Sequence, residues 1–168
     1  LSYMATNVLS LTKVENQTIL SDVTEYNLSE QIRSCILLLE NKWSRRDLEL
    51  QLEFGEHMIS ANEELLKQVW INLLDNAVKF TPDGHTIQVR ISETDHSITV
   101  DVLNTGSEIP KESQAKIFNK FYQADESHAT QGNGVGLAIV KRIAQLHGGT
   151  VAVSSENEVT VFTVELPK

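Results

Sequence analysis

The chain has 168 residues, of which 40% are hydrophobic and 22% charged, and its formal net charge is −9 at pH 7. This composition fits one packed domain with some additional chain, and the acidic balance disfavours nucleic acids and anionic membrane surfaces as partners. The one cysteine, Cys35, excludes an intrachain disulfide and a zinc site built on several cysteines. No apolar run approaches the roughly 20 residues of a membrane span, and no stretch has the pattern of a signal peptide.

The first 16 residues are predicted to be helical. Apolar residues recur there at three- and four-residue spacing, at Leu1, Met4, Val8 and Leu11. The stripe is narrow and short, so it requires a partner helix. Two interpretations fit: a leader helix packed on its own domain, or the end of a dimeric helical hairpin. Since the chain opens in the middle of this pattern, we expect a fragment of a longer protein. Residues 17–27 are polar, with a short extended stretch near Tyr26, and are predicted to form a linker.

Beyond the linker, the hydrophobic spacing alternates between the periods of helices and strands. First comes a helix with Ser29 as its predicted N-cap and a buried face that includes Cys35. The other elements follow in chain order: a strand over 48–54, a helix from its N-cap Asn62 to about Phe80, a turn at 82–84, strands over 86–93 and 97–104, a short helix near 111–118, a polar loop over 119–133, a helix over 134–147, and strands over 150–155 and 159–166. This order predicts an α/β fold in which a mixed sheet carries its helices on one face.

A group of polar side chains lies along the predicted helix that ends near Phe80. At about 100° per residue, Asn72, Asn76 and Lys79 fall within an arc of about 60° at the margin of the apolar face. Asparagine is a poor helix former, so two of them one turn apart require an explanation. One interpretation is that the amides satisfy nearby backbone groups. The other is that an amide oxygen binds a hard cation that also binds phosphate oxygens, while Lys79 adds a positive charge. Spacing alone favours neither.

A glycine-rich stretch over residues 132–137 opens the helix predicted at 134–147. Glycines let backbone N–H groups approach phosphate, and a helix N-terminus favours an anion. The stretch lacks the preceding strand of a Rossmann turn and the Gly-Lys-Ser/Thr of a P-loop. A flexible hinge into the helix is the competing interpretation.

A third motif, Asn104-Thr105-Gly106, ends a predicted strand. A polar side chain followed by glycine at a strand end can bind the edge of a base while the backbone comes close. The competing interpretation is a turn that only terminates the strand.

Taken in order, four motifs resemble the N, G1, F and G2 boxes of sensor histidine kinases of two-component systems. The motifs run over residues 72–80, 104–110, 118–122 and 132–137. The resemblance covers about residues 25–168 and implies the two-layer ATP-binding sandwich (the GHKL or Bergerat fold) shared with gyrase-type ATPases and Hsp90-type chaperones. It divides the chain into the end of the second helix of the dimerisation domain (1–16), a linker with a first short strand (17–27) and the catalytic ATP-binding domain (28–168).

The resemblance also implies the ligands, ATP and Mg²⁺, and the site that holds them. Asn76 would bind the magnesium ion, while Asn72 and Lys79 would contact the phosphates. Asn104 stands where the family has an aspartate that accepts a hydrogen bond from the adenine amino group. The other residues expected at the nucleotide are Phe80 beside it, Gly106, Ile109 and Thr160 near the base, Phe118 and Phe121 at the lid, and Gly132, Gly134, Val135, Gly136 and Leu137 around the phosphates.

Three positions depart from the family pattern. Asn104 replaces aspartate, so its hydrogen bond to adenine would lack charge assistance, and we expect weaker ATP binding. Glu108 stands where the family has glycine, and its side chain is expected to displace the turn. Gln123 replaces an arginine, for which Lys120 is a nearby substitute.

The implied reaction is transfer of the γ-phosphoryl group of ATP to a histidine. ATPases of this fold place a glutamate one turn before the magnesium-binding asparagine, and that position here holds Asn72, which cannot act as a base. None of the five histidines is followed by Glu or Asp, as the family's acceptor is, so the acceptor is expected upstream of this chain. The alternatives are a degenerate nucleotide-binding module without transfer and an ATPase-type clamp.

The expected partners are the protein's own dimerisation and phosphoacceptor domain, within a homodimer of the full-length protein, and a response regulator. The resemblance implies a cytoplasmic domain of a protein anchored in the cell membrane. No direct contact of this segment with membrane or nucleic acid is expected.

Overall fold

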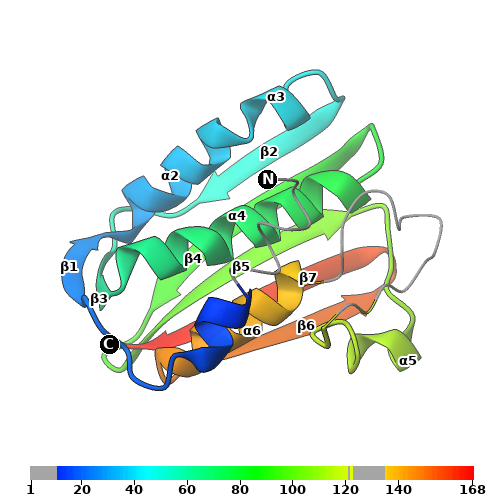
Figure 1. Ribbon diagram of the computed structural model, residues 1–168. Coiled ribbons are helices and arrows are strands. Elements are labelled where there is room, and N and C mark those ends of the chain that lie inside the picture. The colour runs from blue at the N-terminus through cyan, green and yellow to red at the C-terminus, as the bar shows by residue number, and fades with distance from the viewer. Residues whose placement is uncertain (1–10, 121, 123–134) are drawn as a thin grey trace.

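A five-stranded sheet forms one layer of the protein, and the helices cover one of its faces (Figure 1). The computed structural model describes residues 11–120, 122 and 135–168. In spatial order the strands are β2 (Leu48–Glu53), β4 (His85–Glu93), β5 (Ser97–Thr105), β7 (Val159–Pro167) and β6 (Thr150–Glu156). β2 and β4 run parallel, and the other neighbours are antiparallel. The predicted α/β fold, a mixed and mostly antiparallel sheet packed on helices, is confirmed.

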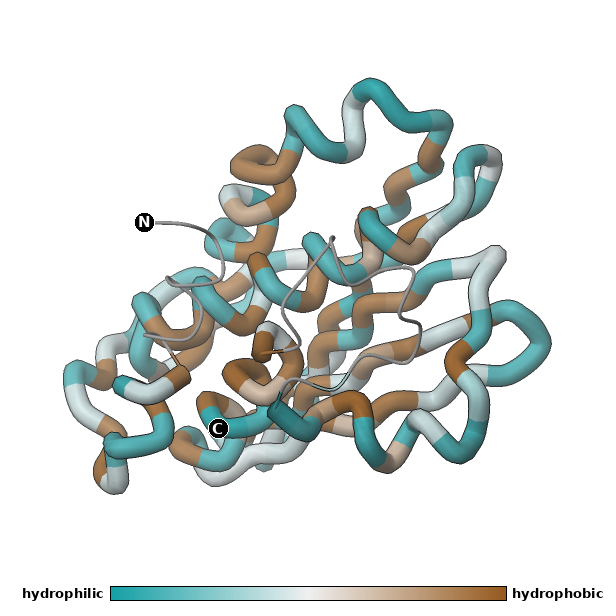
Figure 2. The backbone as a smooth tube through the Cα atoms, turned by 45° about the vertical axis from the view of Figure 1, so that its right-hand side comes forward, coloured by the Kyte–Doolittle hydropathy of each residue, from teal (hydrophilic) through white to brown (hydrophobic). Residues whose placement is uncertain are grey.

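The second layer contains the helices α2 (Leu28–Leu38), α4 (Glu63–Phe80) and α6 (Gly136–Leu146). Hydrophobic residues alternate with hydrophilic ones along these helices and are frequent along the central strands (Figure 2). α4 begins as predicted, because the Asn62 side chain accepts a hydrogen bond from the Leu65 N–H at 3.0 Å. The described residues also form two short helices of four residues each, α3 (Glu40–Trp43) and α5 (Lys111–Gln114). The helix predicted near 111–118 is therefore shorter than expected, and turns follow it.

The start of α2 differs from the prediction. Asn27 caps this helix, since its side chain accepts a hydrogen bond from the Glu30 N–H at 3.0 Å. Ser29 lies inside the helix, fully buried, and its hydroxyl donates to the carbonyl of Gly55 at 2.7 Å. Both residue types are good N-caps. The strand before the helix decides between them, because pairing with Met58 keeps Asn27 extended.

That pairing belongs to a small two-stranded sheet of β1 (Thr24–Asn27) and β3 (Met58–Ala61). β1 corresponds to the short extended stretch predicted near Tyr26. β3 is not predicted, because four residues are too few for an alternating pattern to stand out. The pair joins the segment before α2 to the segment before α4.

Strand alternation directs polar groups towards the helical layer at one end of the sheet. Along β5 the buried positions are Ile98, Val100, Val102 and Asn104. Along β7 they are Thr160, Phe162, Val164 and Leu166. Since the side-chain period of a strand is two, Asn104 and Thr160 share the face of the core residues, and they are paired across the sheet. The core thus ends in two polar side chains beneath the helices.

Residues 11–16 form a helix that packs beside α6. Val14 is 1% exposed, and Leu11 is buried in the same core. The Arg142 guanidinium on α6 donates to the backbone carbonyls of Val14 and Gln17, at 3.4 and 2.6 Å. Within the described residues, no helix is long and apolar enough to span a membrane.

Candidate nucleotide site

The polar margin of α4 faces the N-terminus of α6. An ideal Cβ on Gly136, the first residue of α6, would lie 2.7 Å from Asn72 Oδ1, so only glycine leaves this contact open. The Asn72 amide nitrogen donates to the carbonyl of Gln68 at 2.8 Å, which directs the oxygen towards Gly136. The interpretation in which an amide satisfies the backbone therefore holds for this nitrogen. The asparagine motif and the end of the glycine motif meet in space.

Asn76 lies one turn further along α4 and is half-buried. Within the described residues its side-chain amide has no hydrogen-bond partner. A partly buried amide oxygen without a protein donor is suited to a hard cation that takes its other ligands from phosphate and water. No described cluster of three or more His, Cys, Asp or Glu side chains offers an alternative metal site.

Lys79 occupies the last turn of α4 and makes an ion pair within its own helix. Its Nζ lies 3.2 Å from Asp75 Oδ2, and the Asp75 side chain is 7% exposed. The other oxygen of Asp75 pairs with Lys42 Nζ of α3 at 2.8 Å. Sequence reasoning missed both Asp75 and Lys42. Asp75 could have been identified from its spacing of four residues to Lys79, since residues four apart are neighbours on a helix. No local pattern relates Lys42 to α4.

Asn104 ends the row of buried residues on β5 and is 3% exposed. Its Nδ2 donates to Ser107 Oγ at 3.0 Å. In the described part of the chain its Oδ1 has no hydrogen-bond partner. A buried acceptor without a donor is costly unless a ligand supplies one. The arrangement fits the acceptor that an adenine amino group requires.

A chain of hydrogen bonds holds the turn after β5 in place. The Ile109 N–H donates to Ser155 Oγ at 2.8 Å, and Ser155 Oγ lies 2.7 Å from Thr160 Oγ1. Thr160 Oγ1 in turn donates to the carbonyl of Ser107 at 3.1 Å. Since each hydroxyl has one proton, Ser155 donates to Thr160. This chain brings together three predicted residues, Asn104, Ile109 and Thr160, with Ser107 and Ser155, which the sequence did not identify.

Gly106 has a backbone φ of +89°, and a Cβ there would lie 2.6 Å from the ring of His85. Both features require glycine at this position. Glu108 stands where the family pattern has glycine. It is exposed and accepts a hydrogen bond from the Glu158 N–H at 3.0 Å. Its side chain is therefore engaged with the turn between β6 and β7.

Of the remaining predicted residues, the structure describes Phe80, Phe118, Val135 and Leu137. Phe118 packs edge-on against Phe162 of β7, with ring centroids 6.1 Å apart. Val135 is buried and Leu137 half-buried at the start of α6, and Phe80 is exposed at the end of α4. Phe121, Gly132 and Gly134, and the departure at Gln123, lie outside the described residues. Lys120 pairs with Glu15 of the N-terminal helix at 3.0 Å.

His147 closes the end of α6 and is held through both ring nitrogens. Nδ1 lies 2.9 Å from the carbonyl of Ile143, and Nε2 accepts from the Asn62 N–H at 3.1 Å. Burial lowers the pKa of this imidazole below its usual value. His147 is therefore a structural histidine that joins α6 to the start of α4.

The chain resembles known proteins over most of its length. A sequence profile described as "Histidine kinase-, DNA gyrase B-, and HSP90-like ATPase" matches residues 61–168. The sensor histidine kinase CusS of Escherichia coli K12 is 34% identical over 166 residues, which are 98% of this chain and 35% of CusS. The heme sensor protein HssS of Staphylococcus aureus strain Newman is 32% identical over 99% of this chain and 36% of HssS. The chain thus spans about a third of the length of these curated relatives.

Solved structures agree with the sequence relatives. The nucleotide-free catalytic domain of histidine kinase ThkA superimposes with a TM-score of 0.80 at 32% identity, over 88% of this chain and 97% of that domain. ThkA in complex with the response regulator protein TrrA gives a TM-score of 0.79 at 29% identity, over 98% of this chain and 47% of that chain. Full-length ShkA in complex with AMPPNP gives a TM-score of 0.84 at 26% identity, over 98% of this chain and 35% of that chain. The chain belongs to the histidine kinase-, DNA gyrase B- and HSP90-like ATPase family, as a catalytic ATP-binding domain of the sensor histidine kinase type.

Proposed function

We propose that this domain binds ATP with Mg²⁺ and, in its full-length protein, delivers the γ-phosphoryl group to a histidine that lies upstream of this chain. The observation that carries the proposal is the contact between Asn72 and Gly136. It brings the asparagine side of α4 and the N-terminus of α6 together with no side chain between them. Amide groups, a lysine and a helix N-terminus are a suitable set for a chain of phosphates.

The two ends of the nucleotide would be bound in different ways. Asn104 would accept from the adenine amino group, at the buried end of β5. Asn72 and Lys79 would contact the phosphates, near Gly136. The space between and around these groups would be lined by the other predicted residues: Phe80, Gly106, Ile109, Phe118, Phe121, Gly132, Gly134, Val135, Leu137 and Thr160. ShkA has been solved in complex with AMPPNP, which supports nucleotide binding as the function of this chain.

Asn76 is the residue that would hold magnesium. Its amide is half-buried and has no hydrogen-bond partner among the described residues, which fits a ligand to a hard cation. When bound, the ion would neutralise charge on the β- and γ-phosphates. The protein's own contribution is to keep the Asn76 oxygen on the polar margin of α4, one turn from Asn72, which contacts Gly136 at the N-terminus of α6.

Transfer to a protein histidine is favoured over hydrolysis because Asn72 cannot act as a base. Its nitrogen already donates to the carbonyl of Gln68, so the side chain is held as a hydrogen-bonding group. Catalysis would then depend on positioning and on charge stabilisation, with residues 119–133 controlling access to the nucleotide. A degenerate binding module and an ATPase-type clamp are the alternatives.

The proposed partners follow from the relatives. ThkA has been solved in complex with the response regulator protein TrrA, which supports a response regulator as a partner of the full-length protein. The name of CusS marks it as a sensor. We propose that the domain works within a homodimeric sensor kinase anchored in the cell membrane, on its cytoplasmic side, with residues 1–16 as the end of the second dimerisation helix.

Titration calorimetry of the 168-residue chain with ATP and Mg²⁺ tests the binding half. We expect binding that Asn76→Ala weakens strongly and that Asn16→Ala, which removes an exposed amide from the N-terminal helix, leaves unchanged. Labelled ATP offered to a longer protein with the upstream histidine tests transfer, and the label should reach that histidine. A longer protein that binds ATP tightly without becoming labelled would support the degenerate module. Steady phosphate release from the 168-residue chain, abolished by Asn76→Ala, would support the ATPase clamp.

A further inference from the structure

The last turn of α4, which carries Lys79, is held by residues from outside all four motifs. These residues belong to the α3 segment, defined as residues 40–46. Arg46 donates to the carbonyls of Val78 and Thr81, at 3.1 and 2.6 Å, and pairs with Asp83 at 2.5 Å. A cation at a helix C-terminus satisfies the last carbonyls and opposes the negative end of the helix dipole. The end of α4 is thereby fixed in position.

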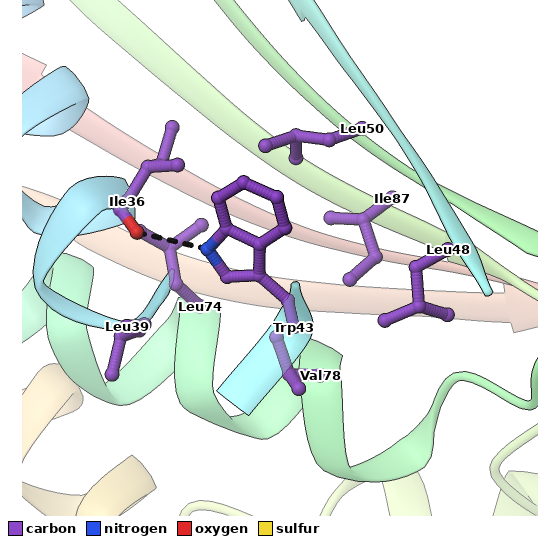
Figure 3. Close-up of a pocket in the computed structure, with 8 residues that line it drawn as sticks. All are labelled: Ile36, Leu39, Trp43, Leu48, Leu50, Leu74, Val78 and Ile87. Carbon is purple, nitrogen blue, oxygen red and sulfur yellow. Dashed lines mark hydrogen bonds between the residues drawn. The ribbon is translucent and has the colours of Figure 1, made fainter. Parts of the chain in front are cut away.

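Trp43 docks the α3 segment on α4 through an apolar pocket (Figure 3). Its indole lies among side chains of α2, α4, β2 and β4, and Leu74 and Val78 of α4 are part of the lining. The indole N–H donates to the carbonyl of Ile36 at 2.9 Å. Leu74 immediately precedes Asp75, so the pocket and the charged group share one turn of α4. Trp43 thus holds its neighbour Lys42 over Asp75.

Asp75 is the buried centre of a group with two cations. Its side chain is 7% exposed, while that of Lys42 is 51% exposed. Lys42 and Lys79 bind different oxygens of the same carboxylate, at 2.8 and 3.2 Å. Removing the cation from a buried carboxylate strongly destabilises a protein, because an uncompensated charge is left in the interior. With two cations, Asp75 can release one and keep the other.

We propose that Lys42 is a positioning residue for nucleotide binding, which keeps Asp75 compensated when Lys79 turns from Asp75 to the phosphates. This inference rests on the proposed function, in which Lys79 contacts the phosphates. Without Lys42, movement of Lys79 to the nucleotide leaves the Asp75 carboxylate buried without a cation. Lys79 is then held on Asp75, and ATP must compete with that ion pair. Lys42 acts on the nucleotide only through Asp75 and Lys79.

The test compares Lys42→Gln with the matched variant Arg45→Gln, which removes the same charge from an exposed position of the same segment. Calorimetric titrations with ATP and Mg²⁺, and separately with adenosine, measure affinity. We expect Lys42→Gln to weaken ATP binding roughly tenfold, in the range of couplings within a shared ion-pair network. Adenosine binding should not change, because adenosine has no phosphates. Arg45→Gln should leave both affinities unchanged, and Lys42→Arg should retain ATP binding.

A second substitution separates this role from a general effect on folding. Asp75→Asn in the Lys42→Gln background removes the charge that retains Lys79, so ATP affinity should recover. The inference is overturned if the unaltered chain binds ATP and Lys42→Gln binds it equally well. It is also overturned if ATP and adenosine weaken together, or if Asp75→Asn restores nothing. Failure of the unaltered chain to bind ATP is a separate result, which removes the proposed function and this inference with it.

Discussion

At the scale of single residues, Asn104 is buried, and its Oδ1 has no hydrogen-bond partner among the residues that the structure describes. Its nitrogen is bound to Ser107, and Ser107 is held in turn by Thr160 through its carbonyl. The hydroxyl of Ser107 can donate as well as accept. An aspartate at this position would therefore still find a partner in Ser107. It would also carry a charge into a site that is 3% exposed.

Asn104→Asp should tighten ATP binding about fivefold, because a charged acceptor forms a stronger hydrogen bond with the adenine amino group than a neutral one. The same change should lower the melting temperature of the ATP-free protein, since a carboxylate is costly to bury. Calorimetry and thermal unfolding measure the two effects. Asn16→Asp, at an exposed position, is the matched control. An affinity that stays the same or falls would mean that Asn104 does not face the base.

The residues proposed to contact the nucleotide could be identified from the sequence, whereas the residues that hold them in place could not. Asn72, Asn76, Lys79, Asn104 and Gly106 belong to motifs in which residue type and spacing together indicate the chemistry. Ser107 and Ser155 are ordinary residues whose hydrogen bonds depend on bringing β5, β6 and β7 together. Lys42 lies 33 residues before Asp75, so no periodic pattern relates them.

At the scale of secondary structure, the site depends on how α4 and α6 approach each other. Asn72 Oδ1 lies where a Cβ of residue 136 would be. The close approach therefore requires glycine as the first residue of α6. Glycine is otherwise an unfavourable helix residue, by up to about 1 kcal/mol relative to alanine.

Gly136→Ala should lower the affinity for ATP without a comparable loss of stability against unfolding. The added Cβ should displace the Asn72 amide and lower ATP affinity at least about tenfold, whereas unfolding in urea should show little loss, because the gain in helix propensity offsets the strain. Gly55→Ala is the control, since a Cβ there meets nothing within 4 Å. Equal losses of ATP affinity in the two variants would count against a role for the α4 and α6 contact.

Element boundaries show where local signals are sufficient. Asn62 was correctly predicted as the N-cap of α4, because a polar cap before a long periodic segment is a strong signal. Ser29 was wrong as the N-cap of α2, because the pairing of β1 with β3 keeps the chain extended as far as Asn27. The helix expected at 111–118 ends after Gln114, since four residues give too little periodicity to define a length.

At the scale of the whole molecule, the N-terminal helix is joined to the catalytic domain. Val14 and Leu11 are buried, and Arg142 of α6 binds two carbonyls of the segment. Lys120, in the described start of the segment 119–133, pairs with Glu15 of the same helix. The helix therefore contacts both α6 and the start of that segment. Residues 1–10 lie outside the described residues, so both interpretations of residues 1–16, the leader helix and the end of a dimeric hairpin, stay predictions.

Val14→Ala should lower the free energy of unfolding of the 168-residue chain by about 1–3 kcal/mol, because it removes two buried methyl groups. Urea titration followed by circular dichroism measures the change. Lys13→Ala, at the exposed neighbouring position, should have little effect. If the two variants unfold at the same urea concentration, residues 11–16 are not packed on α6 in solution.

The amino-acid sequence alone is sufficient to predict the fold class, the order of the elements other than α3 and β3, and the motifs of the candidate nucleotide site. These depend on periodicity, capping and spacing, which are local properties. Three-dimensional packing is needed to show that Asn72 meets Gly136, that Asn104 ends a buried row with an oxygen that no described residue binds, and that Lys42 reaches Asp75. Each of these contacts joins elements far apart in the chain, and it exists only once the sheet and the helical layer have packed together.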